Sequence, residues 1–428
     1  MTAKRKKELR GPIVNPANEI LYRTHPARDI TPQKLAAILS EMESGWCQSA
    51  MSFFDEMEEK DLHLATVMQT RVIAAASRQR TIVAASDAKE DRMAGDFVRD
   101  VWESLEGRTR IMQDLLSAIG RGFAVAEIIL EVSDGYLVAS GVNFCPHALF
   151  TFADPQKPGM LLDFPRYLEP GDSRGVELPR DKFIFHAHRA IGGGPLRSGL
   201  YRGLSWYYLF TSMSVKDWMS FMDIYGIPLR LGKFKATADE QSRAVLKRAV
   251  NELGADAAAI ISEDTTIEFV ESKLSGNHSL FENAVEYFNR QKSKRVLGQT
   301  LTTEQGSSGS YALGEVHDRV RRDIMRLDCL MLDETLTRDF LVPLVKANFG
   351  VSKRYPRFES DTETIAERKS RLEDIKTLFA MKAPLAVSQL YNAAGIPEPA
   401  PGDAIVQDAF KEKFSLEKVE KMEEVNAK

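Results

Sequence analysis

The spacing of apolar residues divides the stretch 237–350 into distinct elements. Thr237 and Glu240 have the spacing of a capping box, in which a hydroxyl and a carboxylate satisfy the first free amides of a helix. Apolar residues recur from there to Gly254, a residue suited to the left-handed end of a helix. The pattern therefore predicts a helix over 237–253.

Two short β-like segments come next, Ala257–Ile261 and Thr266–Val270. A polar tetrapeptide between two runs of β-forming residues is typical of a hairpin. We therefore expect a hairpin whose turn consists of Ser262, Glu263, Asp264 and Thr265.

A second capping box, Ser279 with Glu282, begins another helix that ends near Gly298. One face of this helix is apolar, and its last turns are basic. Positive side chains are favoured at a helix C-terminus because of the helix dipole. A second interpretation is a ring of positive charge beside nucleic-acid phosphates, if copies of the segment surround an axis. The apolar residues are Phe281, Val285 and Phe288, and the basic ones are Lys292, Lys294 and Arg295.

The stretch 299–313 has no hydrophobic periodicity and is rich in neutral hydrogen-bonding groups. It is either an ordinary surface loop or a contact of neutral groups with DNA phosphates that lets the DNA slide past. From Gly314 apolar residues return at spacings of three and four, which predicts a long helix ending at 348–350. The polar residues of the loop are Thr300, Thr302, Thr303, Gln305, Ser307, Ser308 and Ser310.

Helices and strands alternate in the preceding part of the chain. Residues 1–30 are polar and basic and predict an extended arm, which we take as a flexible tail or a contact with a neighbouring subunit rather than a nucleic-acid contact. Helices are expected from Pro32 and from Asp61. The turn Ser133–Gly135 between two β-like runs predicts a hairpin.

Four further elements are predicted from local pattern. Residues 182–187 favour a strand, and the aromatic segment 204–225 favours a helix buried on several sides. After Gly350 the composition changes, and helices are expected over 361–381 and 385–394.

Composition and charge argue against several classes of function. The net charge of −4 argues against a protein that grips nucleic acid through a basic surface. The three cysteines include no CxxC pair, which disfavours a zinc site or a disulfide framework and suits the reducing cytoplasm. No apolar run approaches the roughly 20 residues of a membrane span.

Two motifs suggest chemistry only weakly. His186 and His188 lie on one face of a predicted strand, but no motif nearby places a third metal ligand, so core histidines are favoured. The segment Gly192–Pro195 offers backbone amides to a phosphate but lacks the Lys-Ser/Thr of a P-loop. The loop serines lie in no Gly-x-Ser-x-Gly elbow. Catalysis, a metal and a cofactor are therefore not expected.

The segment Leu297-Gly-Gln-Thr-Leu-Thr-Thr-Glu-Gln-Gly306, followed by Tyr311-Ala-Leu-Gly-Glu-Val-His317, resembles the portal protein family of Mu-like bacteriophages. The resemblance extends over roughly residues 30–350. Similar stretches lie at 61–71, 122–127, 195–204 and 221–228.

This resemblance implies an α+β, elongated portal fold with a wing, a two-helix stem, a clip hairpin, a tunnel loop and a long helix. In that fold the polar loop and the basic helix end would face DNA, and the turn at 262–265 would dock partners. The corresponding divisions are an arm over 1–30, the wing over 31–235, stem helices over 236–254 and 277–298, the clip over 255–276, the tunnel loop over 299–313, the long helix over 314–350 and a C-terminal helical wing or crown region over 351–428.

The resemblance also implies a function without catalysis. Portal subunits form a ring, a dodecamer, at one vertex of the virion head, through which double-stranded DNA is packaged and ejected. The implied partners are the terminase large subunit, neck or adaptor proteins, capsid and scaffold, with assembly in the bacterial host cytoplasm. Three alternatives remain: another head–tail adaptor ring, a phosphate-handling enzyme built on Gly192–Pro195 with the two histidines, and a sequence-specific DNA binder, which the charge disfavours.

Overall fold

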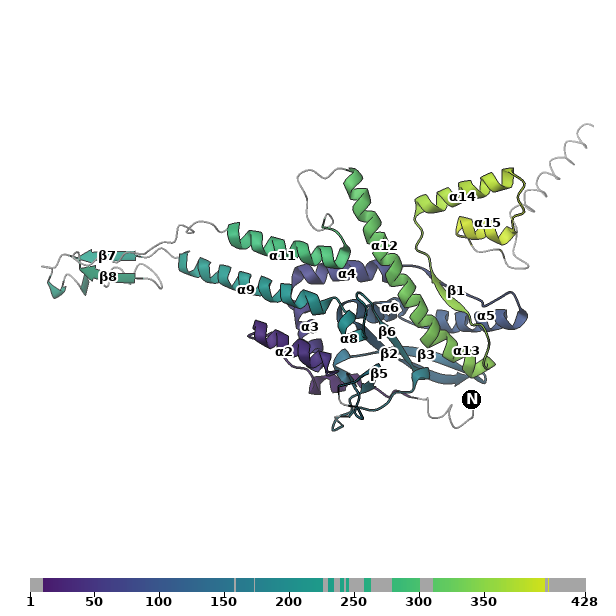
Figure 1. Ribbon diagram of the computed structural model, residues 1–428, viewed down its shortest axis with the longest axis horizontal. Helices are drawn as coiled ribbons and strands as arrows, with labels where there is room; N and C mark the ends of the chain where they lie inside the picture. Colours follow the sequence, from purple (N-terminus) through teal and green to yellow (C-terminus); the bar gives the residue numbers. More distant parts are fainter. Residues whose placement is uncertain are drawn as a thin grey trace, which may run out of the picture. The chain divides into compact units, whose positions relative to one another are not determined.

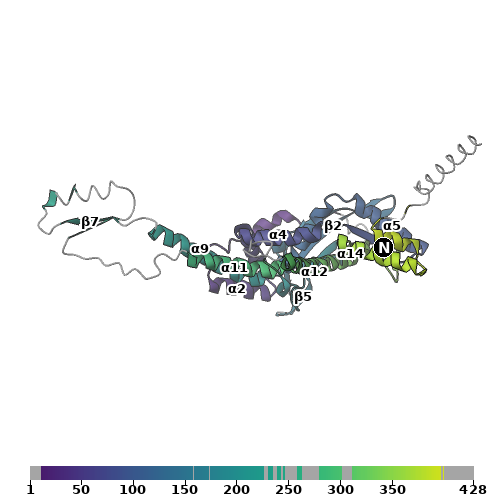
Figure 2. The same ribbon diagram turned by 90° about the horizontal axis from the view of Figure 1, so that it is seen from above.

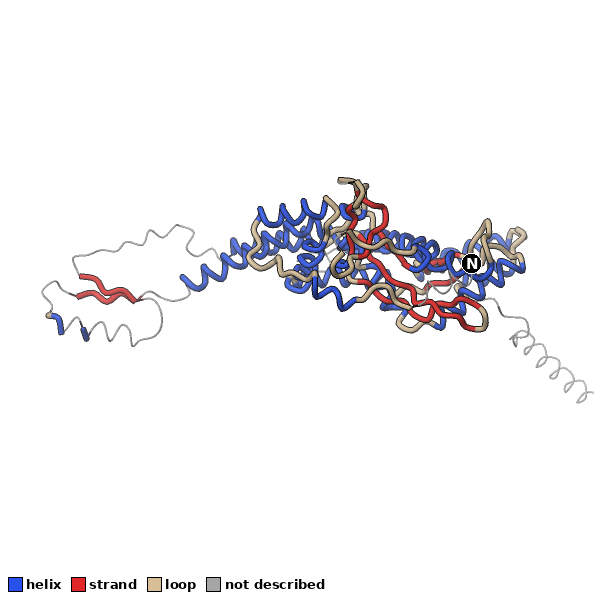
Figure 3. The backbone as a smooth tube through the Cα atoms, turned by 90° about the horizontal axis from the view of Figure 1, so that it is seen from below, coloured by secondary structure: helices blue, strands red, loops and turns tan. Residues whose placement is uncertain are grey.

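A computed structural model describes residues 11–157, 159–172, 174–225, 230–234, 239–241, 244–245, 258–262, 279–300, 311–396 and 399. It divides the chain into two compact units, Met1–Ser360 and Asp361–Lys428. Helices and strands both build the first unit, so the chain is α+β (Figures 1 and 3). Along the described residues we find no helix that combines the length and the apolar character needed to span a bilayer.

The first helices begin at or next to the residues predicted from the sequence. Thr31 accepts a hydrogen bond from the amide of Lys34 at 3.2 Å, and Asp61 accepts one from Leu64 at 2.9 Å. Both predicted helix starts are therefore confirmed. The elements here are a 3-10 helix η1 (Pro16–Leu21), then α2 (Pro32–Glu43), α3 (Gln48–Lys60) and α4 (Leu62–Ala76).

An antiparallel three-stranded sheet of order β3-β2-β6 forms the centre of the first unit. Its strands are β2 (Phe123–Ser133), β3 (Tyr136–Cys145) and β6 (Phe183–Ala187). The turn residues Asp134 and Gly135 have positive φ angles of 49° and 83°, as the tight hairpin turn requires. The predicted hairpin and the predicted strand near 182–187 are both confirmed.

Shorter elements surround this sheet. Two small antiparallel sheets join β1 to β9 and β4 to β5. The bounds are β1 (Arg80–Val83), α5 (Lys89–Ser104), α6 (Arg108–Leu116), α7 (Ala118–Arg121), η2 (His147–Leu149), β4 (Phe150–Ala153), β5 (Leu161–Tyr167), η3 (Arg180–Lys182), α8 (Pro195–Ser198) and β9 (Arg357–Ser360).

The predicted long helix is confirmed, and it begins slightly earlier than expected. It consists of α12 (Tyr311–Leu336), a π-helical turn η4 (Thr337–Leu341) and α13 (Val342–Phe349). Figure 1 shows it beside β6 and β3. Side chains from this helix pair with outer-strand backbone: Asn348 bonds both the amide and the carbonyl of Leu137 at 2.7 and 2.8 Å. Asp339 accepts from the amide of Phe185 at 3.0 Å.

The segment after residue 10 is packed on the chain's own sheet, which corrects the expectation of a free or intersubunit arm for 11–30. The carboxylate of Glu127 accepts hydrogen bonds from the amides of Ile13 and Val14 at 2.6 and 2.9 Å. Lys182 neutralises this carboxylate at 2.8 Å, and both side chains are buried. The ammonium of Lys182 also bonds the carbonyl of Gly11.

Two long helices lie side by side in the first unit, α9 (Tyr201–Tyr225) and α11 (Ser279–Leu297) (Figures 1 and 2). The second matches the predicted helix before Gly298. A parallel pair of strands, β7 (Arg230–Phe234) and β8 (Ala258–Ser262), occurs between them in sequence. The predicted helix over 237–253 and the strand 266–270 lie largely or wholly outside the described residues.

The second unit contains two described helices, α14 (Ile365–Ala380) and α15 (Val387–Ala394). A full capping box begins α14, with Thr364 and Glu367 bonding each other's backbone amides at 3.1 and 2.9 Å. Both helices were predicted, each with slightly wider bounds.

Candidate functional site

The pairing of α9 with α11 is built from aromatic side chains. Phe221 meets Phe281 with ring centroids 5.7 Å apart, and Tyr207 and Phe210 meet Phe288 at 6.1 and 6.0 Å. Later residues of α9 contact earlier residues of α11, so the two helices run antiparallel. The helix that accompanies α11 is thus the aromatic segment predicted to be buried on several sides.

That prediction holds only for the first half of α9. Leu204, Tyr208 and Leu209 are buried in the core of the first unit. From Phe210 onward, large apolar side chains are exposed, among them Met219 and Met222 at 46% and 43%. The aromatic side chains of α9 therefore have two roles. Some pack in the core of the first unit, near the start of the helix, and others pack against α11 farther along it.

Lys292 was predicted as a possible DNA-facing cation, and the structure corrects this. Its side chain is fully buried, and its ammonium pairs with Asp61, the same carboxylate that caps α4. Burial lowers the pKa of Lys292, while the Asp61 carboxylate raises it. Lys292 occupies the same helix face as Phe281, Val285 and Phe288, so its position in the apolar stripe was the signal for burial.

Lys294 and Arg295 are exposed at the end of α11, so their charges are available to a partner. The helix stops at Gly298, which adopts a left-handed φ of 71°. A Cβ there would stand 2.7 Å from Val320 and 3.0 Å from Ile324 of α12. The end of α11 is therefore packed directly against the long helix, with the polar loop between them in sequence.

A buried ion pair joins the two helices that flank this loop in sequence, α11 and α12, to α4. Arg71 of α4 donates two hydrogen bonds to Asp328 of α12, at 2.8 and 2.9 Å. Its remaining terminal nitrogen donates to the carbonyl of Val296 in the last turn of α11 at 3.0 Å. One guanidinium thus links α4, α11 and α12 near the base of the loop.

Of the predicted loop residues, the structure describes only the first. Thr300 is half-buried. The remaining six lie outside the described residues: Thr302, Thr303, Gln305, Ser307, Ser308 and Ser310. Their assignment to DNA contact stays a prediction.

The predicted docking turn is described only at its start. Ser262 is the last residue of β8, which corrects its expected place in a turn. Glu263, Asp264 and Thr265 lie outside the described residues. The described partner of β8 is β7, in parallel register from Arg230 with Ala258 to Phe234 with Ser262. A parallel partner was not predicted, because a short hairpin is the simplest connection between two neighbouring β-like runs.

The two histidines of the β6 region lie inside the protein and not in an open site. His186 is 1% exposed and His188 is 2% exposed. His186 Nδ1 is 2.9 Å from the hydroxyl of Thr335, and His188 Nδ1 is 3.8 Å from Asp328. Burial lowers the pKa of both to about 3, with Arg71 contributing at His188. Within the described ranges, no cluster of three or more potential metal ligands occurs.

The glycine-rich segment 192–194 lies at the surface, apart from the two histidines. Gly192, Gly193 and Gly194 are exposed, whereas both histidines are buried, so the two motifs do not form a common surface. The following turn contacts the end of α7 closely: a Cβ on Gly199 would stand 2.4 Å from the carbonyl of Gly120. This contact explains why glycines occur in both segments.

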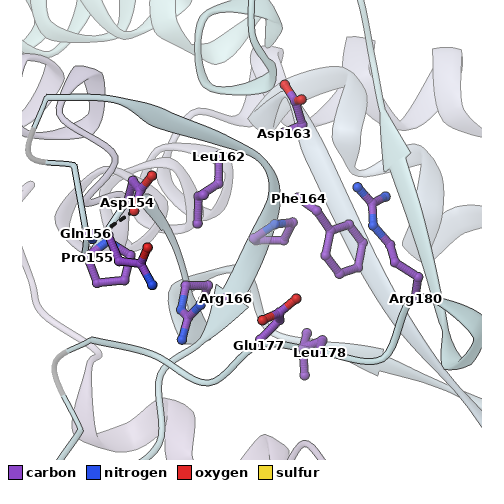
Figure 4. A pocket seen from close by; sticks show the side chains of 11 residues that line it. Asp154, Pro155, Gln156, Leu162, Asp163, Phe164, Arg166, Glu177, Leu178 and Arg180 are labelled. Atoms are coloured by element: carbon purple, nitrogen blue, oxygen red, sulfur yellow. Dashed lines mark hydrogen bonds between the residues drawn. The ribbon is translucent and has the colours of Figure 1, made fainter.

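A polar pocket of about 350 Å³ lies between the β4–β5 ribbon and the segment leading to η3 (Figure 4). Arg180 stacks over the ring of Phe164 at 3.9 Å, and Arg166 donates to the carbonyl of Gly175 at 2.9 and 2.7 Å. Asp163 and Glu177 add negative charge at the same pocket. None of the predicted site residues lines it, and its mixed charge selects no ligand class.

Comparison with known proteins decides the family. A family model described as the portal protein of Mu bacteriophage matches residues 51–396. The chain belongs to this portal family. The match contains the sheet, the α9–α11 pair, the loop and the long helix, so the segments described above are those of a Mu-type portal protein. The family is structural, and its place is the head vertex of the virion.

Two relatives are about 30% identical to this portal protein over the aligned residues. It is 32% identical over 367 residues to the Mu-like prophage FluMu protein gp29 of Haemophilus influenzae, covering 83% of this chain and 69% of the relative. It is 30% identical over 386 residues to the portal protein of Escherichia phage Mu, covering 89% of this chain and 74% of the relative.

Solved structures resemble this portal protein more loosely. A chain in the neck of an empty GTA particle aligns with a TM-score of 0.48 and 12% identity, covering 86% of this chain and 95% of that one. A chain in the virion of a native gene transfer agent particle aligns with a TM-score of 0.48 and 11% identity, covering 90% and 100%.

Proposed function

We propose that this portal protein forms a closed ring, a dodecamer, at the unique head vertex, and that double-stranded DNA is packaged and ejected through it. The observation that carries the proposal is the order of elements in a chain of the Mu portal family. A protruding helix, a segment over 226–278, a returning helix, a polar loop and a long helix follow one another. In the proposed ring, the segment over 226–278 is the outer connector and the polar loop lies beside the channel.

The pairing of α9 with α11 changes the division made from sequence. We assign the stem to these two helices, so α9 replaces the helix over 236–254 in that role. The wing is then the α+β part before α9, and the whole segment 226–278 belongs to the clip. Ser262, Glu263, Asp264 and Thr265 stay assigned to partner docking within that clip.

The loop over 299–313 is proposed as the tunnel loop that faces DNA. Phosphate contacts dominate the affinity of proteins for DNA, so a loop rich in cations would hold the duplex and stall it. Neutral hydroxyl and amide groups, from Thr300 to Ser310, avoid that retention. Lys294 and Arg295 at the exposed end of α11 add a modest positive field beside the loop.

The proposed partners are those that the resemblance to Mu-like portal proteins implies. The terminase large subunit docks on the clip during packaging, and neck or adaptor proteins replace it afterwards. Capsid and scaffold proteins contact the wing while the head assembles in the bacterial host cytoplasm. In this proposal the chain hydrolyses no nucleotide, because its task is to guide DNA while the motor supplies the work.

Negative-stain imaging of the purified full-length chain, with a nucleotide-turnover assay on the same sample, tests this proposal. Rings with a central channel and no turnover are the expected result. Compact dimers that hydrolyse nucleotide would contradict it and would revive the phosphate-handling enzyme.

A further inference from the structure

The outer parts of α9 and α11 present large apolar side chains to solvent. In α9 these include Val215, Met219 and Met222, at 37%, 46% and 43% exposure. In α11 they are Leu280 and Tyr287, at 54% and 49%. Side chains of this size, gathered on two paired helices, mark a surface that a partner covers.

Val215, Met219 and Met222 lie to one side of the line that faces α11, whereas Met213, at 45% exposure, lies on the other side. Tyr207 and Phe221 both contact α11, and Ser214 falls midway between them at the seven-residue spacing of one helix face. Val215 and Met222 each follow such a position by one residue. Each residue advances the helix by about 100°, so both lie about a quarter-turn past the contact line. Met219 lies further round on the same side.

The α11 residues lie on the other side of their own contact line. Leu280 and Tyr287 come one residue before Phe281 and Phe288, which are the rings that meet α9. They are therefore displaced by about 100° in the reverse sense. The two helices are antiparallel. A rotation of about +100° from the contact line of α9 and one of about −100° from that of α11 therefore place these side chains on opposite faces of the helix pair.

The two apolar stripes also lie at the same height along the pair. Phe221 is level with Phe281, and Phe210 is level with Phe288. Val215–Met222 and Leu280–Tyr287 therefore span the same stretch, each about 10 Å long at 1.5 Å per residue. The pair thus has one apolar stripe on each face, matched in level and length.

We propose that the α9 stripe of one subunit packs against the α11 stripe of the next copy of the chain. Opposite faces cannot both be buried by a two-fold dimer, which joins identical patches, whereas head-to-tail association buries both. Because the two stripes lie at the same level along the helix pair, neighbouring copies can be related by a rotation without a translation along its axis. Such copies close into a ring instead of extending into a filament. The flexible methionines fit against the flat ring of Tyr287. This inference rests on the ring of the proposed function and identifies its contact faces.

Disulfide formation in the full-length chain tests the pairing. The native Cys47, Cys145 and Cys329 are all buried, so introduced cysteines are the reactive ones. Met219→Cys combined with Tyr287→Cys is expected to give, on mild oxidation, a ladder of covalent multimers up to the full ring. Each single variant is expected to remain monomeric on a denaturing gel, because neither stripe meets its own copy.

Two results would overturn the interface. One is covalent dimers from the single Met219→Cys variant, which would show that like faces meet. The other is an intact ring in which the double variant yields no multimers, even with a short bis-maleimide. A chain that forms no ring by native mass spectrometry fails the proposed function itself, so the two failures are distinguished. Met219→Glu supplies a second readout: ring loss with unchanged circular dichroism supports the interface, and an unaffected ring contradicts it.

Discussion

Arg71 and Asp328 form a two-point buried ion pair although 257 positions separate them in the chain. The Asp328 side chain is fully buried, and that of Arg71 is 9% exposed. Arg71 also bonds the last turn of α11, so this pair fixes α12 relative to both α4 and the helix that precedes the loop. The base of the proposed tunnel loop is therefore tied to the rigid part of the unit.

Breaking this pair from one side is expected to destabilise the protein strongly. Arg71→Met leaves the carboxylate of Asp328 buried without its main partner, a situation that costs about 3–5 kcal/mol of unfolding free energy. Chemical denaturation monitored by circular dichroism measures the loss.

The double variant Arg71→Met with Asp328→Leu serves as the matched control, because it removes both charges and refills the volume. Its stability is expected to lie much closer to that of the parent protein than the single variant's does. Equal losses in the single and the double variant would contradict the assignment of the cost to an uncompensated charge.

The buried histidines predict a loss of stability in mild acid. Burial holds the pKa of His186 and His188 at about 3 in the folded protein, below the ordinary value of 6.5. As the pH falls below 6.5, the unfolded chain binds protons that the folded chain excludes. The stabilisation present at neutral pH is therefore lost progressively from 6.5 toward 3, with a slope approaching about 1.4 kcal/mol per pH unit for each histidine.

Denaturation series between pH 6.5 and 5 check this slope before most carboxylates titrate. His188→Gln is expected to reduce the pH slope of the unfolding free energy by the contribution of one histidine, whatever its effect on stability at neutral pH. An identical pH slope in the variant and the parent protein would show that His188 is not the titrating group.

Gly122 is expected to tolerate no side chain. It ends α7 with a φ of 96°, and a Cβ there would stand 2.2 Å from the carbonyl oxygen of Pro195. Gly122→Ala therefore combines backbone strain with a backbone clash and should cost at least about 2 kcal/mol of unfolding free energy. Thermal denaturation measures it.

Gly192→Ala is the matched control, since nothing lies within 4 Å of a Cβ at that exposed glycine. Its effect is expected to stay within about 0.5 kcal/mol. A comparable loss of unfolding free energy in both variants would contradict this explanation. Glycine at 122 would then not be required by the close contact between the end of α7 and Pro195.

Added cations in the proposed tunnel loop are expected to slow DNA translocation. Thr302→Lys with Ser307→Lys introduces two charges per subunit where the sequence has hydroxyl groups. Phosphate contacts would then retain the duplex, so packaging by the assembled motor slows while native mass spectrometry still detects the ring. Thr302→Gln with Ser307→Gln is the neutral control. Packaging at the parent rate by the lysine variant would refute the tunnel assignment.

Local signals in the sequence identified most elements of the fold. Pro32 predicted a helix start because proline fits the first position of a helix, and Asp134 with Gly135 predicted the hairpin because the turn itself requires positive φ. Apolar spacing predicted the long helix up to Gly350. Each of these signals depends on neighbouring residues only.

Contacts across long sequence distances were not predictable in this way. Lys292 meets Asp61 across 231 positions, and Glu127 meets Ile13 across 114. Nothing in the sequence names these partners. A charged residue within an apolar helix face, such as Lys292 or Arg71, does signal that a buried partner exists, because an unpaired buried charge is too costly. The pairing of α9 with α11 was missed for the same reason: aromatic content indicated burial but not against which helix.

Native mass spectrometry of the full-length chain tests the central claim most directly. One closed oligomer far larger than a dimer is expected, and a dodecamer of the 48.0 kDa chain has a mass of about 576 kDa. A dimer as the largest species under conditions that keep the chain folded would contradict the head-to-tail ring, because its two opposite apolar faces could not both be covered.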